Sequence, residues 1–224
     1  MSPKRRNSLS SREETRLSKL MALVLRHQPD RVDVELDEHG AVDIDELADA
    51  IGEMPGWEFL RPEHIVQVVE GCPRERFKID QDNHTVRASY GHSLPEMVVY
   101  EPAVPPAKLY HGSSPHDASD IQSQGLYPLD RQYVHLSVTA RLAYEVGSRH
   151  DDEPVVMVID AAAAHADGVE FYHATDDIWL VKHLPAEYLV EWDKQADNGN
   201  EEFDEDEEFE DDVEFEDDDT EDED

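Results

Sequence analysis

Cysteine is almost missing from this chain of 224 residues, because Cys72 is the only one. A single cysteine excludes an intrachain disulfide and a zinc site built from several cysteines, and it suits a reducing compartment. Long apolar runs are also missing, so no segment is expected to span a membrane. The basic start, MSPKRRNSLSSREE, is not followed by the hydrophobic segment of a signal peptide. We therefore expect a cytoplasmic protein.

Positive charge is scarce as well. The chain has 19 Lys and Arg against 55 Asp and Glu, which gives a formal net charge of −36. Acidic residues are densest from Glu201 to Asp224, and mutual repulsion opposes burial there, so we predict a disordered acidic tail at 195–224. The rest of the chain is also acidic. Solvated carboxylates keep a protein soluble at high salt, which suggests a halophilic source, with an ordinary acidic protein as the alternative.

Residues 12–100 are predicted to form a winged-helix-like lobe. Apolar residues from Leu17 to Leu25 recur at helical spacing, and Pro29 ends that helix just past Arg26 and His27. DIDELADAI and RPEHIVQVVEG predict two further helices. VELDEHGAVDI and RFKIDQDNHTVRASYGHS each predict a hairpin. Helices followed by a hairpin favour this type of lobe.

The remaining ordered part is predicted to be a second lobe at 108–194. The prolines of YEPAVPPAK mark a stiff linker at 101–107. Beyond it, strands are predicted at KLYHGS, YVHLS, PVVMVID, VEFYHA and DIWLVKHL, and helices at PHDASDIQSQG and VTARLAYEVGSRH. This mixed order predicts an α+β lobe.

Common catalytic motifs are lacking too. The 12 histidines are scattered, and the chain contains no HExxH, CxxC, GxSxG or Walker-type loop. We therefore expect no metal site. Carboxylates are so abundant that a pair of them indicates little beyond a solvated surface.

The scarce basic residues carry the most information, because each is placed against the overall charge. Arg26 and His27 end a predicted helix, where the helix dipole favours cations in any protein. Arg87 lies on a predicted strand, where an ion pair would explain it. Arg131 precedes VHLS and could be a loop charge, and His111 follows a strand and could be a turn histidine. Taken singly, each residue has such an explanation.

Taken in order, LRHxP, RFxxD…RAxxGHS, LYHGS, RxxVHLS, VGxRH and WL resemble the RNA 2′-phosphotransferases, from Leu17 to Trp192. The resemblance implies an α+β protein with a winged-helix-like N-terminal lobe and an ADP-ribosyltransferase-like C-terminal lobe. It also implies that the partners are NAD and an RNA, such as spliced tRNA, that bears an internal 2′-phosphate. With the acidity, it suggests a halophilic archaeon as the source.

The resemblance assigns roles to particular residues. The family's Arg-His-Arg-Arg tetrad falls on Arg26, His27, Arg87 and Arg131. Its NAD-binding motifs fall on His111, Gly112, Ser113, His135, Leu136, Ser137, Gly147 and Arg149. Ser113 stands where Thr is common and keeps the hydroxyl group. Asp176 and Asp177 stand where Asn-Gly is common, and because a carboxylate beside a pyrophosphate is unfavourable, Asp176 should point away or the strand should lie elsewhere.

The implied reaction needs no metal and uses NAD as a co-substrate. The 2′-phosphate displaces nicotinamide to give an RNA-phospho-ADP-ribose intermediate, which resolves into 2′-hydroxyl RNA and ADP-ribose 1″,2″-cyclic phosphate. We expect a monomer that does not bind membranes. Two alternatives stay open: an ADP-ribosyltransferase that modifies nucleic-acid ends or protein, and a non-catalytic winged-helix regulator. The second would need a basic recognition helix, and RPEHIVQVVEG has only Arg61.

Overall fold

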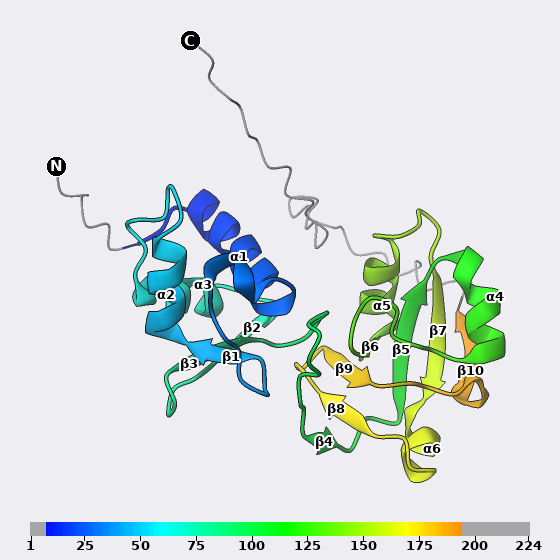
Figure 1. The fold of residues 1–224 in the computed structure, drawn as a ribbon. Coiled ribbons are helices and arrows are strands. Elements are labelled where there is room, and N and C mark those ends of the chain that lie inside the picture. The colour runs from blue at the N-terminus through cyan, green and yellow to red at the C-terminus, as the bar shows by residue number, and fades with distance from the viewer. Residues whose placement is uncertain (1–7, 194–224) are drawn as a thin grey trace.

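The computed structural model describes residues 8–193, and the predicted tail at 195–224 lies outside that range. The described chain forms two lobes that lie side by side, with helices α1 to α3 and a small sheet in the N-terminal lobe and a larger sheet in the C-terminal lobe (Figure 1). The expectation of a mixed α+β fold is confirmed. Within the described residues, no helix is both long enough and apolar enough to cross a membrane.

The N-terminal lobe packs three helices against a three-stranded sheet of order β1-β3-β2. Its elements are α1 (Ser11–Arg26), the 3-10 helix η1 (Pro29–Val32), β1 (Ala41–Asp43), α2 (Ile44–Gly52), α3 (Pro62–Glu70), β2 (Phe77–Asp80) and β3 (Thr85–Ala88). Helix α1 begins at a capping box in which Ser10 and Glu13 bond each other's backbone N–H groups, and it ends just before Pro29. Its apolar face is buried, so its last residues are held firmly in place.

One predicted hairpin is confirmed and the other is wrong. Strands β2 and β3 pair antiparallel, with Lys78 opposite Arg87. VELDEHGAVDI does not form a hairpin, because only its end becomes a strand, β1, which pairs with β3 instead. The preceding turn is closed by Asp37, whose carboxylate accepts from the backbone N–H groups of His39 and Ala41. The predicted first strand of this hairpin is therefore absent, and an extended segment followed by the turn at Asp37 takes its place.

The C-terminal lobe contains a seven-stranded antiparallel sheet of order β10-β7-β5-β6-β9-β8-β4. Its elements are β4 (Pro102–Ala103), β5 (Lys108–Ser113), α4 (Pro115–Gln124), β6 (Val134–Ser137), α5 (Ala140–Gly147), β7 (Val155–Asp160), α6 (Ala161–Ala166), β8 (Phe171–His173), β9 (Ile178–Val181), the 3-10 helix η2 (Ala186–Tyr188) and β10 (Leu189–Asp193). All the predicted strands and helices of this lobe are present. The sequence did not predict α6 or β10. It also did not predict β4, which lies within the expected linker at 101–107 and pairs with β8 at the sheet edge.

A cluster of aromatic rings joins the connecting segment to the larger sheet. Tyr100 packs edge-on against Tyr133, which in turn packs edge-on against Tyr172, with ring centres 5.3 and 5.4 Å apart. The Tyr133 hydroxyl donates to the carbonyl of Val98 at 2.9 Å. Elsewhere the Lys78 ammonium donates to the Ala174 carbonyl at 2.6 Å, which links β2 to the β8–β9 loop. The two lobes are therefore in direct contact.

Helix α5 packs on strand β5 through glycine. A Cβ atom added to Gly112 would lie 1.8 Å from the Ala143 carbonyl oxygen, and the Gly147 backbone nitrogen would be 3.0 Å from it. Only a residue without a side chain permits this approach of helix and strand.

We expect Gly112→Ala to destabilise the protein by at least the ~1–3 kcal/mol typical of overpacking, because neither the strand nor the helix backbone can move freely. The midpoint of thermal unfolding measures this. Gly52→Ala is the matched control, since its Cβ would meet nothing closer than the Trp57 oxygen at 3.9 Å. Equal midpoints for Gly112→Ala and the wild type would contradict the packing described here.

Candidate functional site

The site begins at the end of helix α1, where Arg26 and His27 lie next to each other. Arg26 is only 2% exposed, and its guanidinium carbon lies 5.1 Å from the centre of the Tyr90 ring. His27 is the C-cap residue of the helix. Its Nδ1 lies 2.7 Å from the Ser93 hydroxyl. Both side chains are therefore fixed by residues that follow strand β3.

A short loop, Gly91–His92–Ser93, holds the two lobes together at this point. The Ser93 backbone N–H donates to the Arg26 carbonyl at 3.0 Å. From the other lobe, Arg131 Nη1 donates to the Gly91 carbonyl at 2.8 Å, and the Gln132 N–H donates to the His92 carbonyl at 2.9 Å. We call these three residues the junction loop. It brings Arg26 and Arg131 to one place from distant parts of the chain.

Gly91 is required in the junction loop for two reasons. Its φ of +89° is a conformation that other residues rarely adopt. A Cβ there would also lie 2.7 Å from Arg131 Nη1 and 3.5 Å from Arg26 Cδ. Gly91 therefore lies between the two arginine side chains.

The pKa of His92 is lowered by burial and by the charges of the predicted tetrad. Burial, followed by the positive charges of Arg26, His27, Arg87 and Arg131, lowers the pKa of His92 to about 3. Charges act on an imidazole this way only when they are close to it. Arg26, His27 and Arg131 each bond a residue of the junction loop, and Arg87 lies on β3, the strand that leads into this loop. We call Arg26, His27, Arg87 and Arg131 the cation cluster.

Hydrogen bonds fix the orientation of the His92 ring. Its Nδ1 lies 3.2 Å from the Tyr100 hydroxyl, which donates to the Ser89 carbonyl at 3.1 Å. Since the hydroxyl proton is used there, His92 Nδ1 carries the proton that joins the two rings. His92 is therefore a neutral side chain, held by Tyr100, in the loop that bonds the arginines.

Two histidines of the predicted NAD motifs are coupled on neighbouring strands. His111 on β5 lies with its Nδ1 3.0 Å from the His135 carbonyl oxygen on β6, so Nδ1 is the protonated donor. Burial lowers the pKa of His111, so its Nε2 is an acceptor near neutral pH. Burial first, then the charges of Arg131 and Arg26, lowers the pKa of His135 to about 3. His135 thus lies next to the cation cluster as well as to His111.

The His135 ring also contacts Tyr90 edge-on, with ring centres 5.7 Å apart. Its Nε2 is buried and has no hydrogen-bond partner within the described part of the chain. A buried polar atom of this kind is costly unless a ligand satisfies it. The sequence named His135 through VHLS, but no pattern indicated Tyr90 as its neighbour.

The remaining residues of the predicted NAD motifs are more spread out. Ser113 ends β5 and Ser137 ends β6, and both side chains are buried. Leu136 is a core residue, and Gly112 and Gly147 form the contact between β5 and α5. Arg149 follows α5 and is exposed. For these residues the cofactor role stays a prediction, and Leu136, Gly112 and Gly147 also have a packing role.

The Asp176–Asp177 pair lies in the loop between β8 and β9, and both residues are exposed. The strand that follows was placed correctly, because β9 begins at Ile178. The Asp176 backbone N–H lies 3.4 Å from a carboxylate oxygen of Glu75 in the other lobe. The loop therefore borders the contact between the lobes.

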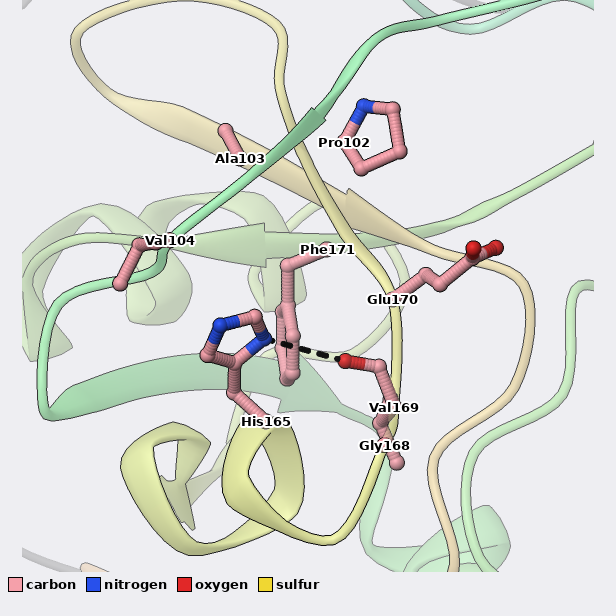
Figure 2. A pocket seen from close by; sticks show the side chains of 8 residues that line it. All are labelled: Pro102, Ala103, Val104, His165, Gly168, Val169, Glu170 and Phe171. Atoms are coloured by element: carbon pink, nitrogen blue, oxygen red, sulfur yellow. Dashed lines mark hydrogen bonds between the residues drawn. The ribbon is translucent and has the colours of Figure 1, made fainter.

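Outside the cation cluster, two other kinds of site are relevant in the described chain: a metal-binding group of side chains and a pocket. No group of three or more His, Cys, Asp or Glu side chains is arranged to hold a metal within residues 8–193. Figure 2 shows a pocket of about 260 Å³ beside β4, β8 and α6, with His165 Nδ1 3.4 Å from the Val169 carbonyl oxygen. None of the predicted site residues lines it. The candidate site is therefore the cation cluster and its histidine neighbours.

Comparison with known proteins gives one consistent result. The model of the family described as "RNA 2'-phosphotransferase, Tpt1 / KptA family" matches residues 12–183. A "Probable RNA 2'-phosphotransferase" of Acetivibrio thermocellus is 37% identical over 175 residues, which is 78% of this chain and 95% of that protein. Proteins of the same description from Bacillus thuringiensis and Pyrococcus horikoshii are each 37% identical, over 79% and 78% of this chain and 94% and 96% of their own.

We expect acid to destabilise the fold through His92 and His135. The folded imidazoles have a pKa of about 3, whereas the ordinary value of 6.5 applies after unfolding, so acid protonates the unfolded chain first. Their contribution to stability is present above the unfolded pKa and is lost as the pH falls towards the folded one. At pH 5 each histidine should have lost roughly 2 kcal/mol.

Denaturant unfolding at pH 7 and pH 5 measures this loss. His92→Gln cannot be protonated, so between these pH values it should lose about 2 kcal/mol less stability than the wild type. The same pH dependence in both proteins would contradict the burial of a neutral His92.

Proposed function

The chain belongs to the RNA 2′-phosphotransferase, Tpt1 / KptA family, and on that premise we propose that Arg26, His27, Arg87 and Arg131 bind the RNA 2′-phosphate. The protein is an RNA 2′-phosphotransferase, and its family uses NAD as a co-substrate. Membership in a family of enzymes sets aside the alternative of a non-catalytic regulator. The observation that carries the proposal is the geometry of the junction loop, which bonds Arg26, His27 and Arg131 and follows the strand that bears Arg87.

The charges of the cluster suit the proposed ligand. A 2′-phosphate carries nearly two negative charges near neutral pH and has three acceptor oxygens. Guanidinium groups present forked donors that match such oxygens, which an ammonium group does less well. An anion of this charge would also relieve the repulsion among cations that the fold holds close together.

His27 supplies a donor of a different kind. The contact between its Nδ1 and Ser93 fixes the ring, so we assign Nε2 as the nitrogen that faces the phosphate. Either protonation state is accessible to an ordinary histidine near pH 7. His27 would therefore donate to the phosphate when charged, and could move a proton as the transfer proceeds.

We place NAD against the histidine side of the cluster. His135 Nε2 is a buried polar atom without a partner among residues 8–193, and it lies next to the arginines, so it suits a ligand that meets the phosphate there. His111, Ser113, Ser137 and Arg149 would hold the remainder of NAD, with Gly112, Leu136 and Gly147 shaping the backbone around it. NAD supplies the ribose carbon that accepts the phosphate as nicotinamide departs.

The chain's own contribution would be orientation and charge. The phosphate is already a nucleophile, so its attack needs no general base. Arginines on both sides would hold it in place and stabilise the charge that shifts during transfer. We further propose that 12–100 is a winged-helix-like RNA-binding lobe and 108–194 an ADP-ribosyltransferase-like NAD-binding lobe, in a cytoplasmic monomer that needs no metal.

The arginine substitutions test the phosphate site most directly. Each of Arg26→Ala, Arg87→Ala and Arg131→Ala should remove a charge-assisted contact of roughly 1.5–3 kcal/mol. That corresponds to a loss of about tenfold to a hundredfold in single-turnover rate on a 2′-phosphorylated RNA. Lysine should restore only part of the rate, and double substitutions should not be additive, because the three share one ligand.

Arg141→Ala is the matched control, because Arg141 is exposed and pairs with Glu145 at 3.1 Å. It should change the rate by less than the roughly fivefold that 1 kcal/mol represents. Rates close to wild type in folded Arg26→Ala or Arg87→Ala would refute the phosphate site.

Ser113→Ala tests the NAD side. Removing the hydroxyl should raise the KM for NAD by about tenfold, the effect of a lost hydrogen bond near 1.4 kcal/mol, while RNA affinity stays within twofold. The exposed Ser123, whose hydroxyl only bonds the Asp120 carbonyl in its own helix, gives the control Ser123→Ala. An unchanged KM for NAD would remove Ser113 from the cofactor site.

A further inference from the structure

Tyr90 contacts both halves of the proposed site. It lies between strand β3 and the junction loop and is half-buried. The Arg26 guanidinium carbon lies 5.1 Å from the ring centre, and the His135 ring meets it edge-on at 5.7 Å with an interplanar angle of 68°. Arg26 comes from the N-terminal lobe, whereas His135 lies on β6 of the C-terminal lobe. The ring of Tyr90 therefore connects the phosphate side to the NAD side.

The contact with Arg26 has a physical reason. Arg26 is 2% exposed, and a buried cation loses its hydration, which is costly. The negative face of an aromatic ring attracts a cation, more strongly when both are shielded from water. Unlike a carboxylate, the ring neither neutralises the charge nor uses a guanidinium N–H. The ring thus stabilises the charge of Arg26 without occupying the N–H groups that would bind a phosphate.

The contact with His135 extends this effect to the other lobe. His135 lies on β6, where its backbone carbonyl accepts a hydrogen bond from His111 Nδ1 on β5, and its ring packs against Tyr90. The Tyr90 ring therefore lies against both Arg26, assigned to the phosphate, and His135, assigned to NAD.

We propose that Tyr90 is a positioning residue, which fixes the Arg26 guanidinium for the 2′-phosphate and sets its placement relative to His135 and NAD. The proposal rests on the phosphate role of Arg26. The alternative is that Tyr90 only fills space, since it also packs at the edge of the aromatic cluster around Tyr100 and Tyr133. The two views predict different kinetics for the folded protein.

The first experiment compares two substitutions of Tyr90 in single-turnover assays at saturating NAD and 2′-phosphorylated RNA. Tyr90→Leu keeps apolar bulk but removes the ring face, and should lower the rate by about thirtyfold, the fold change equivalent to ~2 kcal/mol. Tyr90→Phe keeps the face and should recover most of the rate. With NAD varied at saturating RNA, the KM for NAD should change by less than threefold in both, because the β5–β6 pairing and the His111–His135 hydrogen bond keep the NAD ligands in place.

A double substitution separates positioning from packing. In an Arg26→Ala background, Tyr90→Leu should lower the rate by less than about threefold, because the cation it holds is gone. The matched control is Tyr172→Leu: the Tyr172 ring also has a cation over it, Lys182 at 5.7 Å, and an aromatic neighbour, but that cation lies outside the cluster. Tyr172→Leu should lower the unfolding midpoint without lowering the rate per folded molecule.

If Tyr90→Leu does not fold, a replacement that keeps the shape of the ring tests the same proposal. Pentafluorophenylalanine at position 90 fills the same volume but reverses the charge distribution of the ring face, so it should lower the rate as strongly as leucine. A wild-type rate in that variant or in folded Tyr90→Leu would overturn the proposal, and so would full additivity with Arg26→Ala. A wild-type enzyme without turnover, or a fully active Arg26→Ala, would instead refute the proposed function or phosphate site.

Discussion

The site depends on the hydrogen bond from the Arg131 guanidinium to the carbonyl of Gly91. Through this bond, Arg131 of the C-terminal lobe is attached to the junction loop. The same loop bonds Arg26, because the Ser93 N–H donates to the Arg26 carbonyl. Like charges repel, so arginines gather only where the backbone supplies acceptors and a neutral support. The junction loop supplies the carbonyls, and His92, kept neutral by burial, supplies the support. The remaining contacts of the cluster follow from this arrangement.

The cation cluster stands out because the rest of the chain is acidic. A broad basic surface would attract any nucleic acid, but here cations concentrate at one point in a chain with a net charge of −36. In molar salt the screening length is only about 3 Å, so contacts at a single phosphate would act while the acidic surface repels RNA little. The halophilic source remains a prediction that rests on acidity alone.

Local signals in the sequence predicted most of the elements, but not the way in which they meet. Pro29 correctly ended the helix at Arg26, and alternation correctly indicated the β2–β3 hairpin. Spacing in the chain does not indicate that Arg26 and Arg131 meet at the same loop, and the resemblance, not periodicity, assigned them to one site. No pattern pointed to Tyr90, because an isolated aromatic residue has no neighbours in the sequence that reveal its contacts. Strand β4, within the predicted linker, was missed for a related reason: Pro102 is compatible with an edge strand, and only the position of β8 makes it one.

The segment between the lobes has a consequence for how substrates arrive. Val98 and Tyr100 are buried in the aromatic cluster, and β4 is paired with β8, so this stretch is built into the larger sheet along much of its length. A rotation of one lobe against the other about this segment would have to break the β4–β8 pairing or the aromatic contacts. If RNA and NAD were captured without such a rotation, their encounter rate would be set by diffusion and by the surface potential outside the cluster.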